Sequence, residues 1–112
     1  MQVVVEEELK LRPDLQPAVA DATALLEAEL GPYAPVIQAC WSLAPDNHDR
    51  TFMELRLADR TGSVSYRFAP EEMASRNHMK VRLHRLWGDF LQVRSHVQLD
   101  GMLWDLSKLE AE

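Results

Sequence analysis

The residues best placed to do chemistry lie in the polar segment 44–50. There, Asp46, His48 and Asp49 could offer oxygen and nitrogen ligands to a divalent ion. Their spacing matches neither the calcium-loop pattern nor a zinc signature. Asp and Asn also occur in tight connections, where their side chains hydrogen-bond to the nearby backbone. The spacing therefore favours a turn, and whether these three residues bind an ion stays open.

The other reactive side chains form no catalytic pattern. Cys40 has no base close by in the sequence that would lower its pKa. In the acidic run from Glu6 to Glu8 only alternate residues of a strand could converge. The chain lacks a Gly-rich phosphate loop, a nucleophile elbow, a Cys-x-x-Cys pair and a His-Glu-x-x-His motif. We therefore predict no catalytic residue, no bound metal and no cofactor, and we favour a non-catalytic protein.

The stretch from Thr51 to Phe90 carries the strongest structural signal. Apolar and polar residues alternate over 53–58 and again over 63–68, and Asp59 and Gly62 flank the link between the two runs. A period of two with a short Asp/Gly link predicts a β-hairpin. Farther on, apolar residues recur at steps of four and three, which predicts an amphipathic helix: Met79, Leu83, Leu86, Phe90, Val93 and Val97.

The remaining elements complete an α+β fold. We expect an edge strand over 2–9, a helix from Asp14 to Leu30 that ends at Gly31, and a strand over 35–43. After the hairpin, one helical turn over 70–75 precedes the main helix from about Asn77. We predict a mostly antiparallel four-stranded sheet with two helices on one face, in the order β-α-β-β-β-α. One domain then covers residues 1–97.

Residues 98–112 form a C-terminal helical extension in this prediction. A helix unbroken from Asn77 to Leu109 would be about 50 Å long, much longer than a compact domain of this size allows. Either Gly101 turns the chain back onto the body, or a second chain covers the apolar positions. We expect a homodimer contact here, through Leu99, Met102, Leu103, Trp104 and Leu106.

Charge is unevenly distributed along the chain. The formal net charge is −6, which argues against a general nucleic-acid or anionic-membrane binder. Residues 1–31 carry −5, residues 76–96 carry +4 and residues 97–112 carry −3. The acidic and basic regions could pack against each other within the fold or could simply be solvated. The alternative is that the basic region docks a partner. The candidate partner-binding residues are Arg76, Lys80, Arg82, Arg85 and Arg94.

Composition points to the cytoplasm. A single cysteine excludes an internal disulfide, and nothing else argues for secretion. No apolar run approaches the roughly 18 residues of a membrane span. The first residues lack the basic start and apolar core of a signal peptide.

The element order over residues 1–97 resembles that of the N-terminal domain of ribosome hibernation factors and, more loosely, double-stranded-RNA-binding folds. That resemblance implies RNA binding through basic helices, although the first helix here is acidic on its outer side. Two functions are therefore expected. The first is a non-catalytic, self-associating protein-interaction or regulatory module whose protein partner is unknown. The alternative is a ribosome- or RNA-associated domain that uses the basic helix 76–96.

Overall fold

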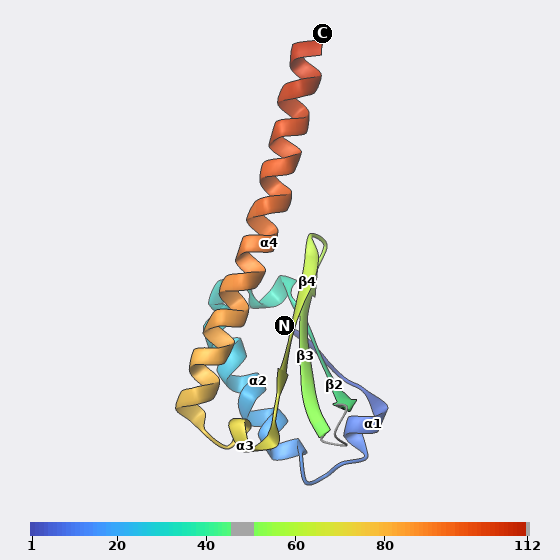
Figure 1. The fold of residues 1–112 in the computed structure, drawn as a ribbon, viewed down its shortest axis with the longest axis vertical. Coiled ribbons are helices and arrows are strands. Elements are labelled where there is room, and N and C mark those ends of the chain that lie inside the picture. Colours follow the sequence, from blue (N-terminus) through green and yellow to red (C-terminus); the bar gives the residue numbers. More distant parts are fainter. Residues whose placement is uncertain (46–50, 112) are drawn as a thin grey trace.

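The computed structural model describes the secondary structure of residues 1–45 and 51–111, and the side chains of residues 1–44 and 51–95. Asp46, His48 and Asp49 therefore lie outside the described residues, and so do the side chains of Leu99 to Leu106. The elements are β1 (Gln2–Val5), α1 (Glu7–Lys10), α2 (Gln16–Leu30), the 3-10 helix η1 (Gly31–Val36), β2 (Gln38–Pro45), β3 (Thr51–Asp59), β4 (Gly62–Phe68), α3 (Pro70–Met73) and α4 (Arg76–Ala111). Figure 1 shows α2 and α4 side by side on the same side of the sheet, and Trp41 Nε1 of β2 donates to Thr23 Oγ1 of α2 at 3.0 Å.

The four strands form one sheet in the order β1-β2-β3-β4. β1 runs parallel to β2, with Gln2 opposite Gln38, whereas β2, β3 and β4 are antiparallel neighbours. The expectation of a mostly antiparallel sheet was therefore wrong: the sheet is mixed. The reason is the connection, because α1, α2 and η1 carry the chain back to the end of the sheet where β1 began, and β2 then starts in the same direction.

The hairpin of β3 and β4 confirms the predicted alternation. Met53, Leu55 and Leu57 are fully buried on the helix side of the sheet, and Leu57 pairs with Val64 across the hairpin. Gly62 opens β4 at a φ of +154°, and a Cβ there would lie 3.1 Å from Cγ1 of Val93 on α4. A residue without a Cβ therefore lets the hairpin end pack closely against the helix.

The first strand is shorter than expected, and the helix count is larger. β1 ends at Val5 and the single turn of α1 begins at Glu7. This change of backbone turns Leu9 into the core, where it is completely buried. Because helix replaces strand here, Glu7 no longer has to share a sheet face with the valines. The alternation of apolar and polar residues breaks at Glu7 because the strand has already ended at Val5.

Helix α2 ends as predicted but starts differently. Gly31 has a φ of +54° and stops the helix. Asp14 does not cap the start: no side chain caps this helix, and the Asp14 carboxylate pairs with Arg12 at 3.0 Å instead. The buried side of α2 meets that of α4, and the residues that share this core are Val19, Ala22, Leu26, Leu30, Met79, Leu83, Leu86 and Phe90.

Helix α4 does not turn back at Gly101. It runs without interruption from Arg76 to Ala111 and crosses the predicted boundary at residue 97. The molecule is consequently elongated, with extents of 61 × 31 × 22 Å and a radius of gyration of 16.9 Å, against about 13 Å for a compact domain of this length. In Figure 1 the C-terminal part of α4 projects beyond the sheet. The turn back at Gly101 is therefore excluded, and coverage of this segment by a second chain stays a prediction.

Candidate functional site

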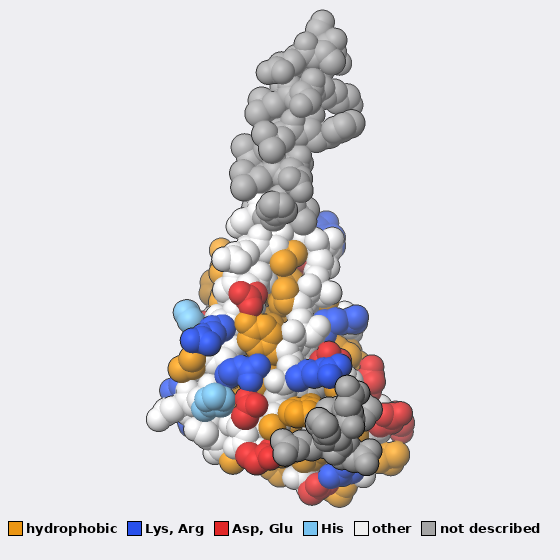
Figure 2. All heavy atoms as spheres, in the orientation of Figure 1, with side chains coloured by type: hydrophobic (Ala, Val, Ile, Leu, Met, Phe, Trp, Pro, Cys, Tyr) orange, Lys and Arg blue, Asp and Glu red, His pale blue; other side chains and the backbone are white. Residues whose placement is uncertain are grey.

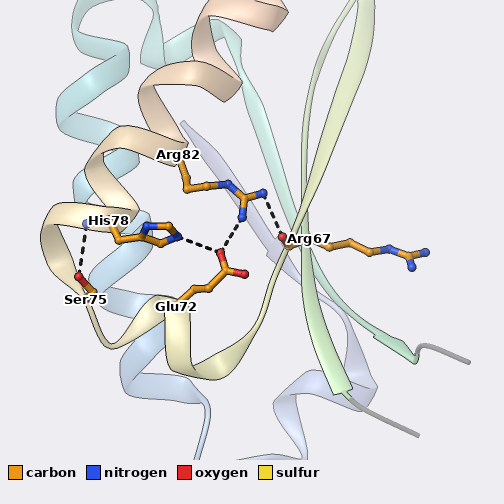
Figure 3. Close-up of polar contacts among 5 residues, drawn as sticks. All are labelled: Arg67, Glu72, Ser75, His78 and Arg82. Carbon is orange, nitrogen blue, oxygen red and sulfur yellow. Dashed lines mark hydrogen bonds and ion pairs between the residues drawn. The ribbon is translucent and has the colours of Figure 1, made fainter. Parts of the chain in front are cut away.

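The densest polar cluster lies where α3, α4 and β4 meet (Figure 3). Arg82 Nη1 donates to Glu72 Oε2 at 2.6 Å, and Arg82 Nη2 donates to the Arg67 carbonyl oxygen at 3.2 Å. A second nitrogen, His78 Nε2, lies 3.2 Å from the same Glu72 oxygen. The Arg82 guanidinium also stacks over the rings of Tyr66 and Phe68, at 5.2 and 4.8 Å from their centroids. One arginine thus joins three elements.

The cluster sets the ionisation of Glu72. Partial burial opposes the charged form, but the His78 hydrogen bond and the Arg82 charge outweigh burial and lower the pKa of Glu72. The carboxylate is therefore ionised near neutral pH and pairs with a permanent cation. This arrangement is that of a structural ion pair and not of a proton-transfer group poised near pH 7.

Tyr66 and Asp89 form a second link between β4 and α4. The Tyr66 hydroxyl donates to Asp89 Oδ2. That hydrogen bond, with burial and the Asp89 charge, raises the pKa of Tyr66. The phenol is therefore held neutral as a donor and is not activated as a nucleophile.

A third link joins the end of the hairpin to α4. Arg94 Nε lies 3.4 Å from Asp59 Oδ2, and the Arg94 guanidinium lies 5.5 Å from the centroid of the Tyr33 ring. Asp59 Oδ1 also accepts hydrogen bonds from the Thr61 amide at 2.7 Å and the Thr61 hydroxyl at 2.5 Å. Burial works against ionisation of Asp59, but the Thr61 hydrogen bonds and the Arg94 charge outweigh it and lower the pKa of Asp59.

The five predicted basic residues fall into two groups, those paired with acidic residues of the same domain and those exposed at the surface. Arg82 and Arg94 are half-buried and bind acidic groups of their own domain. Arg76 and Lys80 line a cavity of about 350 Å³ with Leu25, Ala28, Glu29 and Leu83, between α2 and α4. Arg85 is exposed. The structure does not bring the five together into one continuous basic face, and Figure 2 shows Lys and Arg side chains interspersed with Asp and Glu.

The same region of α2 and α4 carries another cavity and a His–carboxylate pair. A hollow of about 320 Å³ lies next to Arg76 and is lined mostly by alanine and other apolar residues of α2, α3 and α4. His84 Nδ1 lies 2.5 Å from Glu29 Oε1 at the surface. Neither His84 nor His78 lines either cavity. Within the described residues, no group of three or more His, Cys, Asp and Glu side chains could hold a metal ion.

The structure also leaves apolar residues of α4 on the surface. Val81 is 54% exposed and Leu91 is 37% exposed. Gly88 is exposed too, and a Cβ built on it would meet nothing within 4 Å. Sequence reasoning missed these residues because it followed one apolar stripe only. Trp87, by contrast, is buried and stacks on Phe90 at a centroid distance of 5.9 Å, as a core aromatic.

Comparison of the chain with known protein families, with curated proteins and with solved structures finds no match. The resemblance of element order to ribosome hibernation factors therefore stays an expectation. No helix in the described part of the chain is both long and apolar enough to cross a membrane.

Proposed function

We propose that this protein is a non-catalytic interaction module that associates with a second copy of itself through the C-terminal part of α4. One observation carries the proposal: α4 continues unbroken to Ala111, and its C-terminal part projects beyond the sheet (Figure 1). Apolar residues that recur at helical spacing on a projecting helix are typical of a contact with another chain.

The polar clusters support this proposal. Glu72, Tyr66, Asp89 and Asp59 bind groups of their own domain, in arrangements that hold α4 against the sheet. A domain that offers a projecting helix to another chain needs a rigid connection between that helix and its body. The clusters therefore fix the direction in which α4 leaves the domain.

The experiment is a pair of matched substitutions in the full chain. Leu99→Glu with Leu106→Glu introduces charge at two predicted contact positions, and we expect it to convert the protein to a monomer in light scattering. Ser107→Glu with Lys108→Glu adds one negative charge and reverses one positive charge between the apolar positions, and it should leave the dimer intact. A dimer that persists in both variants would place the contact elsewhere, and a monomeric parent would exclude the proposal.

The second candidate is RNA binding by the exposed basic residues of α4. Arg76, Lys80 and Arg85 are exposed and could contact phosphates. Half-buried Arg82 and Arg94 add little to such a surface because acidic partners already neutralise them. Steeply salt-dependent binding of a short RNA duplex would support this function, whereas no binding at low salt would exclude it.

A further inference from the structure

The side of α4 that faces away from the sheet carries a second stripe. Its described members are Val81, His84, Gly88, Leu91 and Ser95, all of them exposed. The buried stripe of Met79, Leu83, Leu86 and Phe90 lies on the other side of the helix. At 100° per residue, the next positions that continue the exposed stripe are Leu99, Met102, Leu106 and Leu109. We call these nine positions the outward stripe.

The spacing of the residues in the outward stripe is symmetric about Ser95. Steps of three, four, three and four residues lead from Val81 to Ser95, and the same steps in reverse lead from Ser95 to Leu109. A two-fold axis at Ser95 would therefore bring each position of one helix opposite a position of an antiparallel copy. The first, third and fourth positions, Val81, Gly88 and Leu91, would meet Leu109, Met102 and Leu99 of the partner subunit.

Side-chain size fits this pairing. Gly88, the smallest residue of the outward stripe, comes opposite Met102 of the partner subunit, and Ser95 comes opposite Ser95 of the partner subunit at the centre. Glycine within an exposed helix costs about 1 kcal/mol relative to alanine, and no neighbour within 4 Å in the described part of the chain requires it. A large side chain from a second helix gives this glycine a packing role.

Charge selects the antiparallel direction. Residues 76–96 carry +4 and residues 97–112 carry −3, so an antiparallel pair lays the basic half of each helix along the acidic half of the other. Lys80 and Arg85, which flank the outward stripe and are exposed, come opposite Glu110 and Asp105 of the partner subunit, respectively. A parallel pair would instead place like charges together along the whole contact.

We infer that two copies of this chain associate through an antiparallel α4–α4 contact centred on Ser95. This inference rests on the proposed self-association and specifies its partner, direction and register. The contact spans residues 81–109 of both helices. It therefore uses the exposed surface of the folded body together with the projecting end.

Oxidative cross-linking tests the register. In a Cys40→Ala background, which removes the native thiol, we expect Ser95→Cys to give covalent dimers. A mixture of Gly88→Cys and Met102→Cys chains should also cross-link, whereas Gly88→Cys alone should not, because its two copies would lie about 21 Å apart along the helices. Ser65→Cys, on the exposed surface of β4, is the control that should stay uncross-linked.

Each alternative result overturns a different statement. Covalent dimers of Gly88→Cys alone would indicate a parallel pair and contradict the inference. A dimer in light scattering in which none of the α4 cysteines cross-links better than Ser65→Cys would keep self-association and reject this interface. A parent protein that is monomeric would reject the proposed function and the inference together. Circular dichroism of each variant shows whether the fold is kept.

Discussion

Arg82 of α4 lies 2.6 Å from Glu72 of α3, through Nη1 and Oε2, and it covers the rings of Tyr66 and Phe68 on β4. The α3–α4 connection contains only Ala74 and Ser75, so this ion pair bridges a tight corner. The corner sets where α4 begins and therefore the line along which it leaves the body. The direction of the proposed interface is thus fixed at the opposite end of the helix from the projecting residues.

Removal of the Glu72 charge should destabilise the domain. Glu72→Gln leaves Arg82 without its anionic partner, and we expect a loss of about 1 kcal/mol in the free energy of unfolding, because the pair is partly exposed and screened by water. Urea denaturation measures this loss. Glu71→Gln, at an exposed neighbouring position, is the matched control and should change stability by less than about 0.5 kcal/mol. Equal stability of both variants would contradict the structural role of Glu72.

The same pair predicts how stability depends on pH. The pKa of Glu72 is lowered in the folded protein, so its contribution is complete above the ordinary carboxyl pKa of about 4.3 and is lost as pH falls through the lower, folded value. The parent should therefore be more stable than Glu72→Gln at neutral pH, and the difference should shrink below about pH 4. A difference that grows on acidification would have the wrong sign for this account.

Two glycines should respond in opposite ways to alanine. Gly62→Ala introduces a Cβ that meets Val93 at 3.1 Å in a backbone conformation that L residues rarely adopt, and we expect destabilisation by more than about 1 kcal/mol. Gly88→Ala meets no atom within 4 Å and should raise stability by up to about 1 kcal/mol. Thermal unfolding, measured at a protein concentration too low for association, compares the two. Stabilisation by Gly62→Ala would show that the hairpin end is not packed on α4 as described.

Charge exchange separates self-association from RNA binding. Lys80→Glu with Arg85→Glu should weaken the dimer, by on the order of tenfold in dissociation constant. Asp105→Lys with Glu110→Lys should do the same, and the chain that carries all four changes should recover much of the affinity, since the charges are again complementary. Sedimentation equilibrium of the four proteins measures the effect. If Lys80 and Arg85 bind RNA instead, the chain with all four changes should not regain RNA affinity, because the RNA phosphates stay negative and would face glutamates at positions 80 and 85.

The parts of the fold that depend on local pattern were predictable from the sequence. Alternation fixed the faces of the hairpin, and the spacing of Met79, Leu83, Leu86 and Phe90 identified the buried side of α4. The parallel pairing of β1 with β2 was not predictable in this way, because strand direction depends on how the intervening helices cross the sheet. The turn from β1 into α1 was hidden by Glu6–Glu8, since a run of three acidic residues is compatible with either backbone.

The sequence allowed us to predict which basic residues belong to the candidate site, but not which residues they contact. The basic residues of α4 were visible in the sequence, but the acidic partners of Arg82 and Arg94 stand 10 and 35 positions away and come from other elements. No local spacing reveals such a pair. The outward stripe did leave a signal in the symmetric steps around Ser95. Its meaning depends on α4 being one straight helix, which Gly101 left undecided in the sequence.

The mass of the full chain in solution tests the central claim most directly. Light scattering coupled to size exclusion, at high micromolar concentration and moderate salt, should give twice the chain mass of 12.8 kDa. The same measurement on Leu99→Glu with Leu106→Glu should give the mass of one chain. A parent protein that remains at 12.8 kDa at every concentration would contradict the account.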